Sequence, residues 1–404
     1  MNKNTILIIT GEDSGDLYGG NLAKEIQRLY PDIKISGVGG KQMRSAGVDI
    51  FCDVSDISVV GFWEVIEKLG LIRRLYKQVV ERLDSGNVKG VVLIDYPGFN
   101  LKVAKAAKER GIAVFYYISP QVWAWRKGRV KAIKKYVDKM MVILPFEKEF
   151  YQREGVDVEF VGHPLLEVIA TPDRIIQGEA ISSSNKKEIC QDLGVDDKKL
   201  IIGILPGSRK KEIAYMLPEI LKASSLIKEK YPSVQFLLPL SQSIEEDYLK
   251  DFITNACHAE RSEESLHSYI KLIKGKNYDV MKVSDLLIIK SGTSTLEAAI
   301  IGIPMIIIYK SSMISYYLAK ALVNVTYAGL PNLLAGKEVA PELLQYKMNA
   351  KSIAEKTTYF LEKKDRLEQM REELKNIKYS LGEQGASKRT ANIIINHIKN
   401  INQF

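Results

Sequence analysis

Short apolar runs rich in Ile, Val and Leu alternate with helical patterns along most of the chain. In the first half, helical patterns over residues 16–29 and 101–111 separate strands predicted over residues 4–10, 88–94, 113–118 and 139–144. After about residue 165 the alternation starts again, with strands predicted over residues 200–205, 235–239, 286–290 and 304–309. Continuous apolar strands separated by helices indicate parallel sheets covered on both faces. The pattern therefore predicts an α/β protein with two Rossmann-like, parallel-sheet domains.

The point at which the alternation restarts also suggests the domain boundaries. We expect a first domain over residues 1–165, a second over 166–345, and C-terminal helices over 346–404 that pack back across the domains. The polar stretch 171–198 is expected to form the connection or its edge. The charged stretch 255–269 is expected to be a surface insertion without a role, because loops tolerate added length at small cost. A metal site there is disfavoured by the spacing of its His, Cys and Glu residues.

Composition narrows the class of protein. The chain has 404 residues, 46% of them hydrophobic and 26% charged, which is ordinary for a globular protein and argues against wholesale disorder. Three widely spaced cysteines (Cys52, Cys190 and Cys257) form no disulfide framework, so a reducing cytosol is the simplest compartment. The N-terminus does not read as a signal peptide, and no uncharged apolar stretch reaches the ~18 residues of a membrane span. The net charge of +9 favours an anionic partner, such as a nucleic acid, a phosphorylated metabolite or an acidic lipid surface.

Polar turns follow the strands, and ligands of parallel sheets bind at the carboxyl ends of strands. The first turn, Gly-Glu-Asp-Ser-Gly-Asp, runs from Gly11 to Asp16 and carries Glu12 and Ser14. Its carboxylates would repel a phosphate, so the turn suits sugar hydroxyls better than a dinucleotide. The alternative is structural: Ser14 or Asp16 caps the following helix, whose dipole favours acids at its start.

A second turn, Asp95-Tyr96-Pro97-Gly98-Phe99-Asn100, follows the strand over residues 88–94. An Asp at a strand end beside a rigid Pro-Gly turn is well placed to act as a general base. Burial would raise the pKa of Asp95 towards neutrality. The structural alternative is an Asp that serves only the turn, because Asx turns are common.

Two further turns lie in the second half and open helices. Pro206–Arg209 lets the backbone approach a ligand closely at Gly207, and Arg209 can form a forked pair with a phosphate. The second turn combines Gly with small hydroxyl residues, as an anion cradle does, and Glu297 could hold ribose hydroxyls. Two such turns in one domain indicate a site for a nucleotide diphosphate, whose expected residues are Gly207, Ser208, Arg209, Ser291, Gly292, Thr293, Ser294, Thr295 and Glu297.

Apolar and basic side chains gather in two segments of the first half. Residues 61–76 place aromatic and aliphatic side chains over most of a helix, and residues 121–139 carry two Trp followed by many Lys and Arg. Such surfaces suit an anionic membrane. The alternatives are a core helix and a solvated basic helix; nucleic acid is a weaker reading, because no binding motif accompanies the charge. The residues expected to face the membrane are Phe62, Trp63, Ile66, Leu69, Lys131, Lys134 and Lys135.

Nearly end to end, the chain resembles the lipid-A-disaccharide synthase family of bacterial glycosyltransferases. The resemblance rests on motifs in the family's order: GEDSGD (11–16), GVGG (37–40), DYPGFN (95–100), SPQVWAW (119–125), LPFEKEFY (144–151), GHP (162–164), LPGSR (205–209), SGTSTLE (291–297) and LPNLLAG (330–336). Residues 255–269 depart from the pattern without touching a motif. So many linked motifs are highly specific.

The resemblance implies an inverting GT-B glycosyltransferase that needs no metal or other cofactor, with two Rossmann-like domains facing across a cleft. It implies transfer of 2,3-diacylglucosamine from UDP-2,3-diacylglucosamine, bound by the second domain, to 2,3-diacylglucosamine 1-phosphate (lipid X) on the first. The products would be UDP and the β-1,6-linked disaccharide 1-phosphate. The protein would act in the cytoplasm, peripherally bound to the inner face of the inner membrane of a Gram-negative bacterium, and could form a homodimer.

Within that reaction, Asp95 is our first choice for the base and Glu12 the second. Residues expected to line the cleft are Ser14, Asp16, Asn100, His163 and Asn332, although a structural role fits His163 equally well. Two other enzymes of this fold remain as alternatives: the N-acetylglucosaminyltransferase of peptidoglycan synthesis and UDP-sugar 2-epimerase. A noncatalytic nucleotide-binding partner at the membrane is the alternative from another class.

Overall fold

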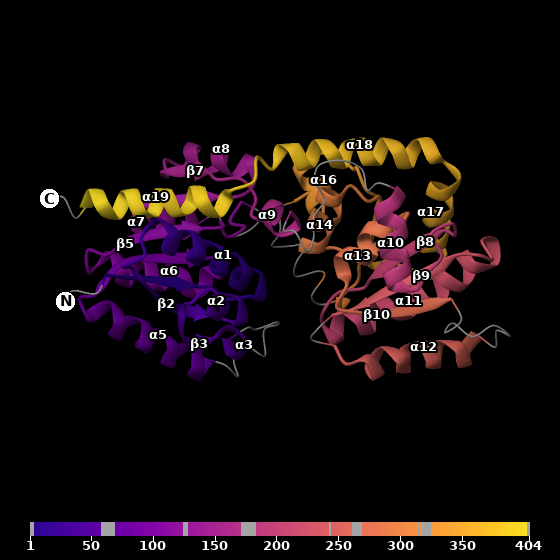
Figure 1. Cartoon of the computed structure of the whole chain (residues 1–404), viewed down its shortest axis with the longest axis horizontal. Helices are drawn as coiled ribbons and strands as arrows, with labels where there is room; N and C mark the ends of the chain where they lie inside the picture. Colours follow the sequence, from indigo (N-terminus) through magenta and orange to yellow (C-terminus); the bar gives the residue numbers. More distant parts are fainter. Residues whose placement is uncertain are drawn as a thin grey trace. The chain divides into compact units, whose positions relative to one another are not determined.

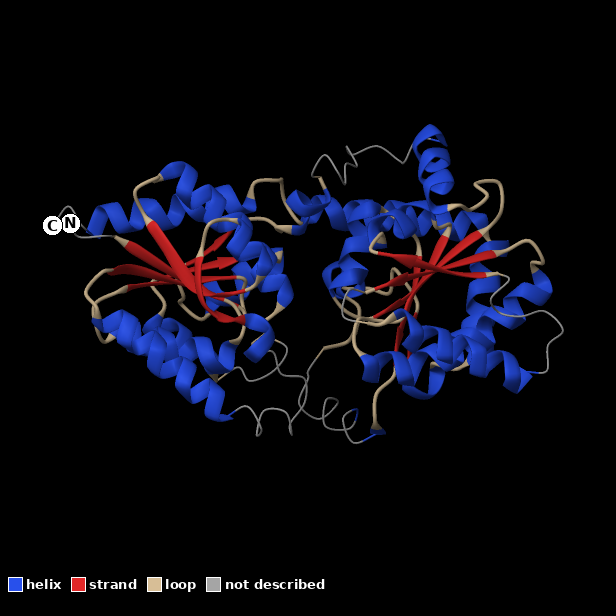
Figure 2. Cartoon of the chain, turned by 60° about the horizontal axis from the view of Figure 1, so that its bottom comes forward, coloured by secondary structure: helices blue, strands red, loops and turns tan. Residues whose placement is uncertain are grey.

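The computed structural model describes residues 4–57, 69–123, 128–170, 183–241, 244–260, 269–313, 316 and 325–401. The chain divides into two compact units, Met1–Glu167 together with Leu381–Phe404, and Val168–Ser380. Each unit is a parallel sheet between layers of helices (Figures 1 and 2). The predicted α/β fold with two parallel sheets is confirmed.

The first unit contains seven described strands in the order β3-β2-β1-β4-β5-β6-β7, all parallel. The strands are β1 (Thr5–Ile9), β2 (Lys34–Gly39), β3 (Asp49–Asp53), β4 (Val88–Ile94), β5 (Ala113–Tyr117), β6 (Lys139–Val142) and β7 (Val158–Phe160). The helices are α1 (Asp13–Leu29), α2 (Lys41–Ser45), α3 (Val54–Ile57), α5 (Leu69–Asp84), α6 (Pro97–Lys108), α7 (Arg129–Tyr136), α8 (Pro145–Arg153) and α19 (Ala386–Ile401), with α9 (Leu165–Ile169) at the boundary.

Helices cover both faces of this first sheet. On one face, α5, α6 and α7 place Val79, Val103 and Ile133 against Val91 and Tyr116 of the central strands. On the other face, α1 packs beside α19, which contacts β5 (Figure 1). Because both faces are covered, the central strands β1, β4 and β5 are largely apolar and buried, as the sequence pattern indicated, whereas the edge strands β3 and β7 also carry acidic residues.

The second unit repeats the arrangement with six described strands in the order β10-β9-β8-β11-β12-β13. They are β8 (Ile201–Leu205), β9 (Gln235–Leu240), β10 (Ile270–Lys274), β11 (Leu286–Lys290), β12 (Met305–Tyr309) and β13 (Glu342–Leu344). The helices are α10 (Ser183–Leu193), α11 (Lys210–Lys230), α12 (Glu246–Glu260), α13 (Asn277–Val283), α14 (Thr293–Ile301), α16 (Leu330–Ala335), the 3₁₀ helix η3 (Gln345–Lys347), α17 (Ala350–Glu362) and α18 (Lys364–Ser380).

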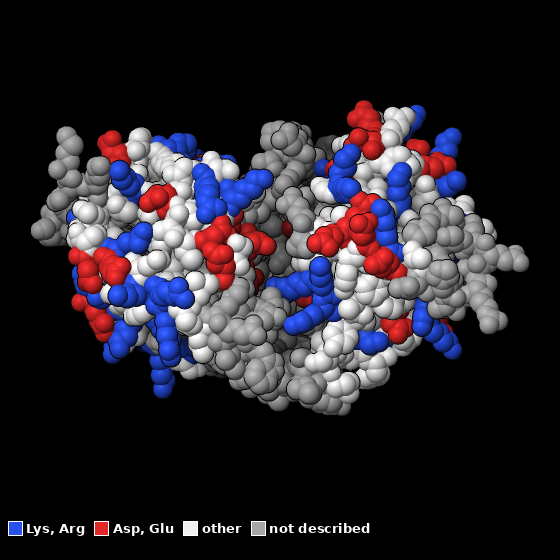
Figure 3. Space-filling view, turned by 90° about the horizontal axis from the view of Figure 1, so that it is seen from below, with Lys and Arg blue, Asp and Glu red and all other residues white. Residues whose placement is uncertain are grey.

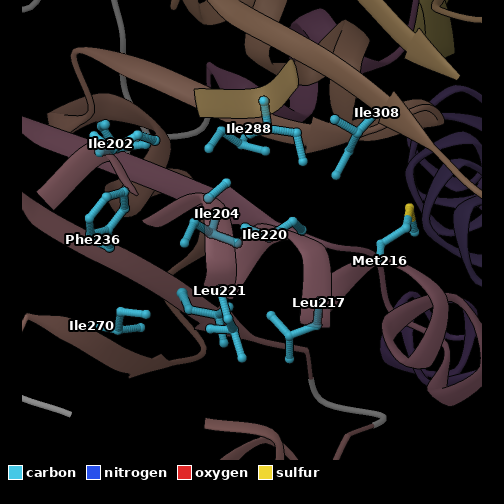
Figure 4. Close-up of a cluster of buried hydrophobic side chains, with 14 of the residues drawn as sticks. Ile202, Ile204, Met216, Leu217, Ile220, Leu221, Phe236, Ile270, Ile288 and Ile308 are labelled. Atoms are coloured by element: carbon cyan, nitrogen blue, oxygen red, sulfur yellow. The ribbon is translucent and has the colours of Figure 1, made fainter. Parts of the chain in front are cut away.

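The core of the second unit holds its site turns in place. Figure 4 shows side chains of β8 and β11 meeting those of α11, among them Ile204, Ile288, Leu217 and Ile220. All four are fully buried, and burial of such a side chain stabilises by about 1.5–3 kcal/mol. Helix α11 is therefore fixed against the two strands whose ends carry the predicted anion-binding turns.

The structure differs from the expected outline in three segments. The stretch 171–198 is more than a connection, because it contains α10, which buries Cys190 and Leu193 against α13. The stretch 255–269 begins inside α12 and ends at Tyr269, a buried residue that packs on Phe236; residues 261–268 lie outside the described residues. The C-terminal helices form no separate region: α17 and α18 belong to the second unit and α19 to the first.

Candidate functional site

Two of the predicted turns flank the topological switch point of the first sheet. Chain connections run in opposite directions from β1 and β4, which lie side by side, and ligands of such sheets bind outside the strand ends at that place. The turn that starts at Gly11 follows β1, and the turn that starts at Asp95 follows β4. The two turns touch, because a Cβ on Gly11 would lie only 2.3 Å from Cγ of Tyr96. The contact between the turns places Glu12 close enough to Asp95 for their charges to interact.

Asp95 and Tyr96 adopt an unusual backbone conformation. Their φ angles are 48° and 46°, in the left-handed region of backbone conformation. Residues other than Gly rarely adopt this conformation, which costs about 1–3 kcal/mol for each residue. Hydrogen bonds fix the conformation: Asn100 Nδ2 donates to the carbonyl oxygens of Ile94 (3.1 Å) and Asp95 (2.7 Å), and the Tyr116 hydroxyl donates to that of Asp95 (2.5 Å). Strain held in this way is typical of functional sites.

The electrostatic environment makes Asp95 a stronger base than an ordinary Asp. Desolvation and, to a smaller extent, the negative charge of Glu12 together raise the pKa of Asp95 to about 6, against a hydrogen bond from the Tyr96 backbone N–H that lowers it. Glu12 itself is exposed at the first position before α1. At neutral pH Asp95 is therefore mostly ionised and able to accept a proton.

Two other residues expected in the cleft carry structural tasks. Both carboxylate oxygens of Asp16, which is buried, accept hydrogen bonds from the backbone N–H groups of Gly40, Gln42 and Met43, at the start of α2. His163 is also buried, and its Nδ1 accepts from the backbone N–H of Leu165. Burial lowers the pKa of His163 to about 3, so its ring is neutral at physiological pH. Ser14 is partly exposed on the first turn of α1.

Sequence reasoning missed a buried carboxylate at the neighbouring strand ends. Glu147 is 1% exposed; it accepts from Trp123 Nε1 (3.1 Å) and from the backbone N–H of Leu144 (3.1 Å). Its burial raises its pKa to about 7. Beside it, Ser119 Oγ and the Tyr151 hydroxyl are 2.7 Å apart. These residues belong to the SPQVWAW and LPFEKEFY motifs, which were the available signal but carried no assigned role.

The second sheet brings its two predicted turns together in the same way. Its switch point lies between β8 and β11, and β8 ends at the turn Pro206–Arg209 while β11 ends just before Ser291. Gly207 has a φ of +111°, and a Cβ there would lie 2.6 Å from Glu212 Oε2. The Arg209 side chain is 46% exposed at the start of α11, where the helix dipole favours an anion.

The turn after β11 is built by its own hydroxyl groups. Ser291 Oγ donates to the carbonyl oxygen of Ala328 (2.6 Å), and Thr295 Oγ1, which is buried, donates to that of Gly292 (2.7 Å). Helix α14 begins at Thr293, followed by Ser294, and its first backbone N–H groups have no partners within the helix. Ser291 and Thr295 thus hold the shape of the cradle.

Two predicted residues of the second unit make side-chain contacts within it. Glu297 Oε1 accepts from the Tyr278 hydroxyl (2.7 Å). Asn332 is buried: its Nδ2 donates to the Ala340 carbonyl oxygen and to Glu342, and its Oδ1 accepts from two backbone N–H groups. Asn332 therefore ties α16 to the strand β13.

The residues expected to face a membrane are only partly described. Phe62, Trp63 and Ile66 lie outside the described residues, and Leu69 is 42% exposed. Further along α5 the core alternative holds, since Leu75 is buried and Ile72 and Tyr76 pack partly against the same core. The expected lysines Lys131, Lys134 and Lys135 are exposed on α7.

Charge is mixed on the surface. On the face seen in Figure 3, Lys and Arg side chains are interspersed with Asp and Glu in both units, so the net charge of +9 forms no single basic surface there. Among the helices that the structure describes, none combines the length and the apolar character needed to cross a membrane. Within the same ranges, no group of three His, Cys, Asp or Glu residues is arranged to hold a metal ion.

Comparison with known proteins identifies the family. A family model described as lipid-A-disaccharide synthetase matches residues 6–396. The chain is 41% identical over 399 residues to the lipid-A-disaccharide synthase of Syntrophus aciditrophicus, which covers 99% of both chains. It is 37% identical over 398 residues to the lipid-A-disaccharide synthase of Coxiella burnetii, which covers 98% of this chain and 100% of the relative.

Solved structures of low sequence identity share the fold. A UDP-GlcNAc 2-epimerase of Neisseria meningitidis aligns with a TM-score of 0.63 at 14% identity, over 97% of this chain and 100% of that chain. MurG of Acinetobacter baumannii aligns with a TM-score of 0.53 at 13% identity, over 98% and 99%. These structural similarities show that the chain has the GT-B type of fold. The family model and the sequence relatives also show its family. The chain belongs to the lipid-A-disaccharide synthase family and is a glycosyltransferase of lipid A biosynthesis.

Proposed function

We propose that the chain transfers 2,3-diacylglucosamine from UDP-2,3-diacylglucosamine to the 6-hydroxyl of 2,3-diacylglucosamine 1-phosphate, with inversion and release of UDP. Family membership supports the reaction class. The observation that carries the assignment of the general base is the turn at Asp95. This turn lies at the switch point of the first sheet, has a strained backbone fixed by hydrogen bonds, and holds a carboxylate whose pKa is raised to about 6.

In this proposal Asp95 is the general base. A hydroxyl group is a weak nucleophile, so a base must accept its proton as the new C–O bond forms. Asp95 takes the proton from the 6-hydroxyl, and the electron pair of that oxygen attacks the anomeric carbon of the donor. Desolvation and the nearby negative charge of Glu12 keep the pKa of Asp95 above that of an ordinary Asp.

The second unit binds the nucleotide and stabilises the leaving group. As the bond from the sugar to the diphosphate breaks, negative charge develops on the phosphate oxygens. Arg209 supplies positive charge, and the starts of α11 at Lys210, just after Ser208, and of α14 at Thr293 supply N–H donors for that charge. Glu297, one turn into α14, is assigned to the ribose hydroxyls, with the Tyr278 hydroxyl holding its carboxylate.

Both proposed substrates carry acyl chains, so the enzyme must meet them at a bilayer. We place it at the cytoplasmic face of the inner membrane as a peripheral protein. The exposed lysines of α7, Lys131, Lys134 and Lys135, support this location, because each Lys near an anionic surface contributes about 1 kcal/mol. Leu69 adds an exposed apolar side chain.

The test is release of UDP by the purified full-length chain, with each substrate alone and with both together. The proposal expects UDP only when both acylated substrates are present, together with a disaccharide 1-phosphate product. Release of UDP from UDP-N-acetylglucosamine without an acylated acceptor would favour another UDP-sugar enzyme. Binding of UDP without turnover under any of these conditions would favour a noncatalytic role and overturn the proposal.

A further inference from the structure

One lysine at the second switch point lies outside the predicted turns. Lys290 is the last residue of β11, and β11 pairs with β8, so Lys290 sits beside the start of the Pro206–Arg209 turn. Its side chain is 18% exposed and forms an ion pair with Glu212, at 2.9 Å between Nζ and Oε1. Its Nζ also lies 5.9 Å from the ring centroid of Tyr309 at the end of β12. Lys290 is thus fixed from two sides at the strand ends.

Glu212 joins this lysine to the arginine of the neighbouring turn. The same oxygen, Oε1, lies 3.4 Å from Arg209 Nη1. Two cationic groups therefore share one carboxylate oxygen, which keeps them close together and leaves one positive charge in excess. The other oxygen, Oε2, is buried without a hydrogen-bond partner beneath Gly207. A carboxylate in that position holds both cationic groups close to the same point of the turn.

We infer that Lys290 is a second phosphate-binding cation of this site, and that Glu212 holds Lys290 and Arg209 at a spacing that suits the two phosphates of a nucleoside diphosphate. The inference rests on the proposed function and adds to it a binding residue and a positioning residue. Arg209 gives a forked contact to one phosphate, and the ammonium of Lys290 gives a point charge to the other. The Lys290 side chain is largely shielded from water, so its charge acts more strongly than one on an open surface.

The central experiment measures binding of UDP and of uridine to the wild-type chain and to Lys290→Met by calorimetry. We expect Lys290→Met to weaken UDP binding roughly 10–100-fold, the worth of a hydrogen bond to a charged group. Uridine, which has no phosphate, should bind both proteins equally. The matched control is Lys274→Met at the end of β10, a lysine of the same unit that also pairs with a glutamate, Glu246, and should leave UDP affinity unchanged.

Removal of Lys290 alone leaves Glu212 without its main partner and could impair folding. The double variant Lys290→Met with Glu212→Gln removes both charges, and Glu212→Gln alone is its reference. The double variant should bind UDP at least about tenfold more weakly than the reference, because only it lacks the lysine. Equal UDP affinity in these two proteins, or in wild type and Lys290→Met, would overturn the inference while the proposed function stands. Failure of the wild-type chain to bind UDP would overturn both.

Discussion

The ring of Tyr96 occupies the space that a side chain on Gly11 would need, with Cγ of Tyr96 only 2.3 Å from the position of such a Cβ. This contact joins the turns after β1 and β4 and thereby sets Glu12 beside Asp95. Neighbouring strands of a parallel sheet bring their ends together, but it is the absence of a side chain at residue 11 that lets the two turns meet this closely.

Gly11→Ala tests that contact. The added methyl group must displace the Tyr96 ring and with it the left-handed backbone at Asp95, so we expect a loss of about 1–3 kcal/mol of stability and a clear fall in turnover. Thermal unfolding and UDP release measure the two effects. Gly70→Ala is the control, because a Cβ on this exposed helical glycine meets no atom within 4 Å. Wild-type stability and turnover in Gly11→Ala would show that the ring moves aside freely.

The pH dependence of turnover tests the pairing of Glu12 with Asp95. The base must be ionised, so kcat/KM should rise with pH and level off above a pKa of about 6. In Glu12→Gln the neighbouring negative charge is gone, which favours ionised Asp95 and moves the acidic limb to lower pH. Desolvation remains, so the limb should stay above the ordinary Asp value of about 3.9. Asp13→Asn, an exposed acid on the same turn, is the control. Loss of turnover at every pH in Glu12→Gln would instead make Glu12 the base.

Arg209→Ala tests the assignment of the diphosphate site. Removal of a charged partner of a phosphate is expected to weaken use of the UDP-sugar by about 2–5 kcal/mol. Arg209→Lys should restore little, because a point charge cannot form the forked contact. Kinetics at varied donor concentration measure the effect, with the exposed Arg366 of α18 changed to Ala as control. Unchanged UDP affinity and turnover in Arg209→Ala would remove this residue from the site.

Exchange of the exposed α7 lysines tests the membrane assignment. Lys131, Lys134 and Lys135 changed together to Gln should weaken binding to anionic vesicles by about 1 kcal/mol for each residue at low salt. Sedimentation with anionic and with neutral vesicles measures the difference, and added salt should reduce binding of the wild-type chain. A triple change of the exposed lysines Lys363, Lys364 and Lys375 to Gln is the control. Equal loss in both triple variants would point to net charge rather than to a docking surface.

The sequence alone supports the fold and the position of the turns, because apolar strands and the polar residues after them are local patterns. The sequence does not predict the role of a residue when that role depends on partners that are distant along the chain. Asp16 reads as an acid at a helix start, yet both its oxygens serve the backbone of residues 40–43. Glu147 and Glu212 lie in the first turns of α8 and α11, and only the fold shows that their partners are Trp123 and Lys290. The strand β2 escaped notice because Gly37 interrupts its apolar run, where a Cβ would lie 2.0 Å from the Ile8 carbonyl oxygen.

Turnover of Asp95→Asn tests the central claim most directly. Asn has nearly the shape of Asp, so the variant should keep the thermal stability and the UDP affinity of the wild-type chain. It cannot accept the proton of the 6-hydroxyl, and UDP release with both acylated substrates should therefore fall by roughly 10²–10⁴-fold, the usual contribution of a general base. A folded Asp95→Asn variant that turns over at nearly the wild-type rate would contradict the account and place the base elsewhere.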